Sequence, residues 1–217
     1  MLGLFDSGSG GMNTVRYIKE NMPTVDLVYK IDRSNAPYGT KNEQELIQIV
    51  ENNISELIDR GADKVLIACC TAGTVYDKLS TPLKLAAIPI IKPISNRAVT
   101  LSLTRKIGVI ATERTVSSHA FMKSMPECTV TEVAAQELVR LIDEGLNDYT
   151  ITDKSKQLLK KIIRPFENKG IDTLILGCTH FPALKESFQS ICLPIGITNI
   201  IDSAKTGAEA VQQTNII

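Results

Sequence analysis

Two cysteines could carry out acid/base chemistry, because each follows an apolar run of the kind that forms a buried β-strand. The segment KVLIACCTAG (64–73) holds Cys69, and the segment DTLILGCTHF (172–181) holds Cys178. Each run leads into a Cys-Thr pair, and the two segments lie roughly half a chain apart. We therefore expect each half of the chain to carry one thiol at the end of a strand, with both thiols facing one cleft between the halves.

Two opposed thiols would suit the inversion of an amino-acid α-carbon. Removing the weakly acidic α-proton and returning it on the other face requires two acid/base groups on opposite sides of a planar intermediate. Cysteine serves this purpose if backbone N–H groups, a helix N-terminus or a charged neighbour lower its pKa from about 8.5. Asp6 or Asp32 is expected to assist the first thiol, and His180 the second.

Other roles for these residues are also open. A cysteine on an apolar strand is more often a packing residue, but two in matching contexts favour a function. Cys69 and Cys70 could form a vicinal disulfide or bind a metal with His180, although no CxxC or HxxxH spacing supports a metal. Cys128 and Cys192 lack such a context and are expected to be structural.

Composition excludes several classes of function. The chain has 217 residues, is 43% hydrophobic, and balances 24 basic against 24 acidic side chains, so no net charge favours nucleic acid or an anionic membrane. The N-terminal residues do not have the pattern of a signal peptide, and no apolar run approaches the length expected to span a bilayer. Five irregularly spaced cysteines are typical of reduced thiols, so we expect a cytoplasmic protein.

Strands and helices alternate along the chain, which predicts an α/β fold with parallel sheets. Leu2–Phe5 is expected to be a strand, followed by the glycine-rich segment Asp6–Gly11 and a helix. Such a turn can bind an anion, but it lacks a dinucleotide or P-loop signature, and a tight turn closed by Asp6 is the simpler alternative. Further along, the pattern predicts a strand at Pro89–Ile94 and a helix at Val116–Lys123.

The second half repeats this order of elements from Lys106 onward. The repeat predicts two pseudo-symmetric lobes, each a mainly parallel sheet flanked by helices, with an active-site cleft between them. We place the N-terminal lobe at residues 1–94 plus 204–217 and the C-terminal lobe at residues 95–203.

Six motifs, taken in order, resemble those of bacterial glutamate racemases, members of the cofactor-independent aspartate/glutamate racemase superfamily. The resemblance covers nearly the whole chain. The motifs are FDSGSGG (5–11), APYGT (36–40), ACCTA (68–72), GVIAT with Thr115 (108–115), LILGCTHFP (174–182) and IDSA (201–204).

The resemblance implies interconversion of L- and D-glutamate for peptidoglycan synthesis, without pyridoxal phosphate or a metal. It implies that Cys69 and Cys178 are the acid/base pair and that Asp6 and His180 assist them. Glutamate is the implied partner, without nucleic acid or membrane, and a homodimer is the expected assembly if the chain self-associates. The implied substrate-binding residues are Ser7, Pro37, Tyr38, Gly39, Cys70, Thr71, Thr115 and Thr179.

The chain departs from the family pattern at three places. Cys70 stands where the family has an Asn whose amide contacts the substrate, and a thiol is a weak donor and a poor acceptor. Ala135-Gln136 replaces Cys-Pro, and Asp143 falls where the family has a supporting Glu with a longer reach. Finally, the chain ends at Ile217, before a further strand and helix found in typical members.

These departures leave two alternatives to a glutamate racemase. One is a racemase for aspartate or another small polar amino acid, and the other is a binding or regulatory protein with weak or no turnover.

Overall fold

The computed structural model describes residues 1–212, which form two compact units. The first contains Met1–Pro93 and the chain from Ala204 onward, and the second contains Ile94–Ser203. The final part of the predicted N-terminal lobe, residues 213–217, lies outside the described residues.

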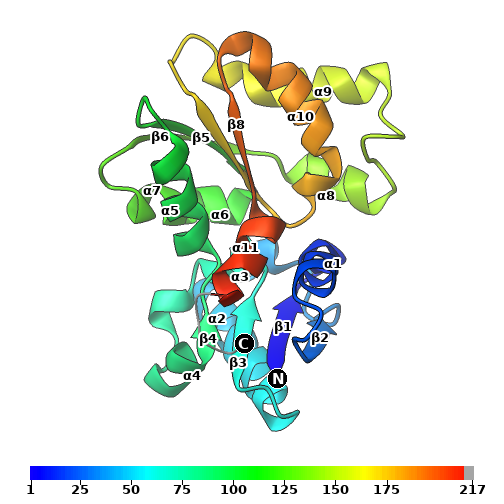
Figure 1. Cartoon of the computed structure of the whole chain (residues 1–217), viewed down its shortest axis with the longest axis vertical. Coiled ribbons are helices and arrows are strands. Elements are labelled where there is room, and N and C mark those ends of the chain that lie inside the picture. The colour runs from blue at the N-terminus through cyan, green and yellow to red at the C-terminus, as the bar shows by residue number, and fades with distance from the viewer. Residues whose placement is uncertain (213–217) are drawn as a thin grey trace. The chain divides into compact units, whose positions relative to one another are not determined.

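The first unit is built on a four-stranded sheet in the order β2-β1-β3-β4 (Figure 1). All neighbouring strands are parallel, and Leu4 of β1 pairs with Tyr29 of β2 and with Leu66 of β3. The central strands are apolar along nearly their whole length because helices cover both faces of a parallel sheet. The strands are β1 (Leu2–Asp6), β2 (Leu27–Ile31), β3 (Lys64–Ile67) and β4 (Ala87–Ile88).

The long helix α2 (Glu43–Asp59) packs on β1 and β3 through an apolar face of Leu46, Val50, Ile54 and Leu57. It begins with a capping box in which the Asn42 and Glu45 side chains each bond the other's backbone N–H. The other helices of this unit are α1 (Gly11–Asn21), α3 (Cys70–Gly73), α4 (Thr81–Ala86) and α11 (Ser203–Gln212), with 3₁₀ turns at Tyr38–Thr40 and Tyr76–Lys78.

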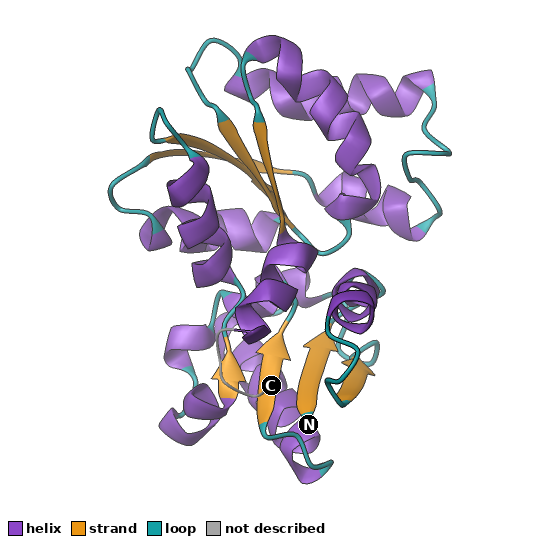
Figure 2. Cartoon of the chain, viewed as in Figure 1, coloured by secondary structure: helices purple, strands orange, loops and turns teal. Residues whose placement is uncertain are grey.

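The second unit repeats this topology with a parallel sheet in the order β6-β5-β7-β8 (Figure 2). Both sheets therefore place their third strand, β3 or β7, in a central position beside the first strand. The strands are β5 (Lys106–Ala111), β6 (Thr129–Ala134), β7 (Thr173–Gly177) and β8 (Asn199–Asp202). The predicted α/β fold of two similar lobes is confirmed.

Helices of the second unit enclose a core that includes Leu138, Leu159, Phe166 and Phe188. The helices are α6 (Glu113–Ser118), α7 (Ala120–Ser124), α8 (Gln136–Asp143), α9 (Asp153–Ile163) and α10 (Lys185–Cys192), with 3₁₀ turns at Arg164–Phe166, Phe181–Leu184 and Leu193–Ile195. Cys192 is fully buried in this core, as expected for a structural cysteine.

Two predicted elements are wrong. The strand expected at Pro89–Ile94 is absent: β4 ends before it at Ile88, and helix α5 (Ile91–Leu101) begins two residues after Pro89. Pro93 fits this helix because it lies in the first turn, where it needs no N–H partner. The helix expected at Val116–Lys123 is two helices, because His119 adopts a left-handed conformation with φ of 53° and ends the first.

Candidate active site

Cys69 lies between β3 and α3, and only 6% of its surface is exposed to solvent. Its Sγ is 3.5 Å from Ser7 Oγ, a hydrogen bond in which either group can donate. Ser7 directly follows β1, which pairs with β3 and ends in the fully buried Asp6. The parallel pairing therefore brings Asp6, Ser7 and Cys69 together at the carboxyl edge of the sheet, where ligands bind in α/β folds.

The Cys69 thiol is held in its protonated form. Burial raises the pKa of Cys69 to about 11, and the Asp6 carboxylate raises it further, against smaller opposing effects of hydrogen bonds from Ser7 and Ala72. The condition named for an acid/base cysteine, a pKa lowered by N–H groups or a helix N-terminus, is therefore not met at Cys69. Removal of the thiol from water and a like charge nearby outweigh the local N–H groups.

The glycine-rich turn after β1 is shaped by Asp6. The backbone N–H of Gly8 donates to Asp6 Oδ1 at 2.9 Å, so the turn is closed by the chain's own carboxylate. A Cβ atom at Gly11 would lie 2.6 Å from Asp6 Cβ and 2.8 Å from the Tyr29 hydroxyl, which explains the glycine there. The tight turn closed by Asp6 is thus the alternative that the structure supports.

A buried network around Asp32 fixes the loop that contains Tyr38. Asp32 is 1% exposed and accepts hydrogen bonds from the Tyr38 hydroxyl at 2.7 Å and from Asn53 Nδ2 at 2.9 Å. Asn35 and Ser34 also donate to this carboxylate. Although burial raises the pKa of Asp32, these hydrogen bonds more than offset it and lower the pKa to about 2.

The second thiol has a different set of neighbours. Cys178 directly follows β7, is 8% exposed, and places its Sγ 3.6 Å from His180 Nδ1. His180 Nε2 lies 3.1 Å from Oδ1 of Asp143, the last residue of α8. The shorter Asp143 side chain therefore does reach the histidine, and a thiol, an imidazole and a carboxylate form a chain of polar contacts.

The structure divides the remaining predicted residues between the two units. Thr71 is buried in α3 beside Cys70, whereas Thr115 is buried in α6 and bonds Thr112, with their hydroxyl oxygens 2.9 Å apart. Thr179 is buried next to Cys178. By contrast, the exposed Pro37 and Gly39 flank Tyr38, whose hydroxyl is already committed to Asp32.

Sequence reasoning missed two residues of this environment. In the sequence, Asn53 is one of several polar residues of a helix. In the structure it is 1% exposed and lies on the face of α2 that contacts Asp32. Tyr29 donates to the Gly8 carbonyl oxygen at 3.3 Å, and burial, followed by the Asp6 charge, raises its pKa. The only sequence signal for the role of Asn53 was its position within the apolar stripe of α2, where a polar residue needs a buried partner. The sequence contained no signal for the role of Tyr29.

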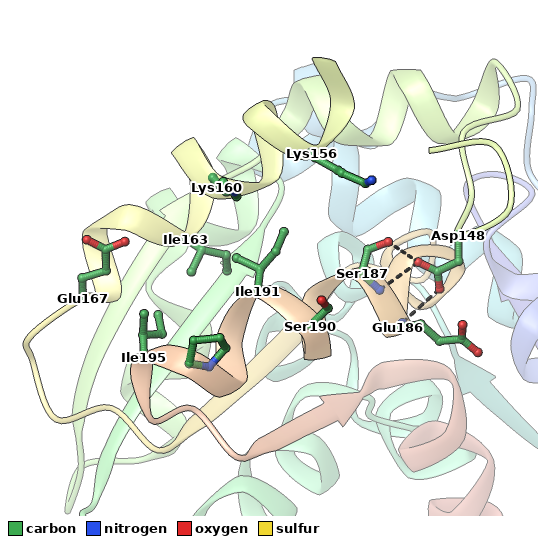
Figure 3. Close-up of a pocket in the computed structure, with 11 residues that line it drawn as sticks. Asp148, Lys156, Lys160, Ile163, Glu167, Glu186, Ser187, Ser190, Ile191 and Ile195 are labelled. Atoms are coloured by element: carbon green, nitrogen blue, oxygen red, sulfur yellow. Dashed lines mark hydrogen bonds between the residues drawn. The ribbon is translucent and has the colours of Figure 1, made fainter. Parts of the chain in front are cut away.

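An open pocket of about 750 Å³ lies between α9 and α10 in the second unit (Figure 3). Its lining contains none of the predicted acid/base or substrate-binding residues, so we assign it no catalytic role.

Within residues 1–212, no three His, Cys, Asp or Glu side chains are grouped to hold a metal ion. No helix in this range is long and apolar enough to cross a membrane.

The fold and the two thiol sites define a class of protein: a duplicated α/β fold in which a buried cysteine follows a central strand of each unit. The family model for Asp/Glu/hydantoin racemases matches residues 13–211. The chain belongs to this racemase family.

Individual relatives agree with this assignment. The chain is 37% identical to the glutamate racemase of Desulforudis audaxviator, over 89% of this chain and 71% of the relative. It is 32% identical to that of Aquifex aeolicus, over 97% of this chain and 82% of the relative. The crystal structure of glutamate racemase from Francisella tularensis in complex with D-glutamate superposes with a TM-score of 0.85 and 28% identity, covering 98% of this chain and 79% of that one.

Proposed function

We infer that this chain is a glutamate racemase that interconverts L- and D-glutamate by proton transfer to and from two cysteines, Cys69 and Cys178. The observation that carries the proposal is the matching position of the two thiols. Each follows the central third strand of its sheet, is almost fully buried, and has its own polar partner. Family membership and the relatives' names favour glutamate as the substrate.

The two sites differ in how they would support proton transfer. Cys69 is a thiol at neutral pH, ready to give a proton, and becomes a base only when its thiolate is stabilised. The positive α-ammonium group of a bound amino acid would supply that stabilisation and partly offset the Asp6 charge. In the second unit, His180 can take a proton from Cys178, with Asp143 stabilising the imidazolium that forms.

The other predicted residues would hold the substrate. We propose that Ser7, Thr71, Thr115 and Thr179 bind its carboxylates and ammonium group through short hydroxyl side chains. Because the Tyr38 hydroxyl bonds Asp32, the loop with Pro37 and Gly39 would contribute backbone groups. Position 70 would also contact the substrate, through a thiol in place of the family's amide.

The cellular role follows from the activity. We propose that the protein supplies D-glutamate for peptidoglycan in the cytoplasm, a setting that fits five cysteines without a disulfide among them. The assembly of a homodimer stays a prediction, which sedimentation velocity can test.

Hydrogen exchange at Cα tests the function directly. Protein incubated in D₂O with each of a panel of amino acids should incorporate deuterium into glutamate, measured by loss of the α-proton NMR signal. Exchange into aspartate or another amino acid in place of glutamate would favour a racemase of altered specificity. If no amino acid exchanges while D-glutamate raises the melting temperature, the chain is a binding protein.

Cys70 is the observation that favours altered specificity, and Cys70→Asn is its test. We expect the variant to raise kcat/KM for glutamate, because the amide adds a strong donor and acceptor that the thiol lacks. Hydrogen bonds of this kind contribute about 1–3 kcal/mol, or roughly 5- to 150-fold. A fall in glutamate activity, with preserved exchange into another amino acid, would instead make Cys70 a determinant of a different substrate. Cys128→Asn, away from both thiol sites, is the control.

A further inference from the structure

Asp148 ties the loop after α8 to the beginning of α10. Its carboxylate accepts hydrogen bonds from the backbone N–H groups of Glu186 at 3.0 Å and Ser187 at 2.9 Å, and from the Ser187 hydroxyl. Figure 3 shows these contacts on one side of the α9–α10 pocket. The backbone N–H of Asp148 donates in turn to the Ala183 carbonyl oxygen at 3.0 Å.

This arrangement replaces a missing local cap. The N-cap position of α10 is Leu184, whose side chain cannot bond the free N–H groups of the first turn. Asp148 supplies the acceptor from a different part of the chain, and its negative charge suits the positive end of the helix. The contact is therefore both a helix cap and a cross-link between two segments.

The cross-link joins the segments that carry the acid/base residues of the second site. Asp143 lies five positions before Asp148, and His180 lies three positions before Ala183. The 3.1 Å contact between Asp143 Oδ1 and His180 Nε2 spans the same two segments. The Asp143 side chain is half exposed, whereas the His180 side chain is almost fully buried.

We propose that Asp148 is a positioning residue that keeps Asp143 within hydrogen-bonding distance of His180. An aspartate has one methylene group fewer than the glutamate of the family pattern, so it cannot compensate for a displaced backbone by extending further. Asp148 fixes that backbone. The inference rests on the proposed function for its effect on turnover, but not for its effect on His180.

The consequence for His180 is a defined tautomer. A carboxylate only accepts hydrogen bonds, so Asp143 requires the proton on Nε2 and leaves the Nδ1 lone pair directed at Cys178. That tautomer is the one that can accept a proton from the thiol. Without Asp148, the imidazole would populate both tautomers.

Nitrogen-15 NMR of the histidine rings tests this directly in the full chain. The chain has two histidines, and His119, which bonds Glu132, serves as an internal reference. We expect Asp148→Ala to convert the neutral His180 signals from one Nε2–H tautomer to a mixture and to leave the His119 signals unchanged. Ser187→Ala, which removes one of the three bonds, should cause a smaller shift in the same direction and guards against a variant that fails to fold. A single Nε2–H tautomer in both folded variants would overturn the proposal.

Kinetics separate positioning from a merely structural role. We expect Asp148→Ala to lower kcat roughly tenfold with KM nearly unchanged, since small displacements of a reacting group are costly. Glu167→Gln, which changes an exposed carboxylate of the same pocket, should leave kcat unchanged.

A double-mutant cycle then identifies the residue through which Asp148 acts. In an Asp143→Ala background, Asp148→Ala should change kcat by less than about twofold. Asp143→Glu, with its longer reach, should recover much of the activity lost in Asp148→Ala. Additive losses and no recovery would overturn the proposal. If the wild-type protein does not racemise glutamate, the proposed function fails, whereas the NMR result still decides the role of Asp148.

Discussion

Cys69→Ser and Cys178→Ser should each abolish racemisation of glutamate, with rates at least about 10³-fold below the wild-type protein. Serine keeps the size and a polar atom, but its hydroxyl is a far weaker acid than a thiol and does not form the base that the mechanism needs. Both side chains are almost fully buried, so solvent water is poorly placed to substitute for either group. The change in the circular dichroism signal of a glutamate solution measures the reaction, starting from either enantiomer.

The two variants should also differ in a way that identifies two separate bases. With one thiol removed, the remaining thiol can still act on one face of Cα, so any residual deuterium exchange should be confined to one enantiomer. The favoured enantiomer should be opposite in the two variants. Cys192→Ser, in the core of the second unit, controls for a general effect of losing a buried cysteine. Full racemisation by either active-site variant would rule out the two-cysteine mechanism.

Asp32→Asn should destabilise the first unit by about 3 kcal/mol while changing almost no volume. The carboxylate accepts hydrogen bonds from Tyr38, Asn53, Asn35 and Ser34. In Asp32→Asn an amide NH₂ group replaces one carboxylate oxygen. Because this group is itself a donor, the donors that bonded that oxygen lose their acceptor. Leaving a buried polar group unpaired costs about 1–3 kcal/mol, and more where a charge took part. Urea unfolding at pH 7 measures the loss.

The same residue should make stability depend on pH in acid. The folded pKa of Asp32 is about 2, below an ordinary value near 4, so its stabilisation is complete above about pH 4. That stabilisation is lost as the pH falls from about 4 towards 2. Asp32→Asn should therefore show a shallower loss of stability over this interval than the wild-type protein. Equal slopes would mean that Asp32 does not stabilise the fold through its charge.

We also expect Asp32→Asn to lower activity, and Asp172→Asn is the matched control for that effect. Asp172 is also buried and accepts bonds from Ser102 Oγ, from Thr173 Oγ1 and from two backbone N–H groups, but it lies at the beginning of β7, away from the thiol. We expect both variants to lose stability. Only Asp32→Asn should lose activity in the folded protein, because it releases the Tyr38 loop.

Much of the fold could be predicted because the pattern of apolar runs is local. The apolar runs at Lys64–Ala68 and Thr173–Leu176 predicted buried parallel strands, which the structure places at Lys64–Ile67 and Thr173–Gly177, and the repeat of strand, turn and helix predicted two units of one topology. The error at Pro89–Ile94 arose where a short apolar run fits either a strand or a helix, and the error at His119 arose where a left-handed residue divides one helical pattern into two helices. There, backbone geometry decided the outcome.

The sequence by itself determined which residues are chemically able to act: two thiols in matching contexts, an aspartate at the end of the first strand and a histidine two residues after the second of these thiols. Only the tertiary structure decided their state and their partners. Burial beside Asp6 raises the pKa of Cys69, Asn53 meets Asp32 from a distant helix, and Asp148 holds a loop that allows Asp143 to reach His180. These properties depend on desolvation and on distances between segments far apart in the chain, and neither is encoded in a local pattern of residues.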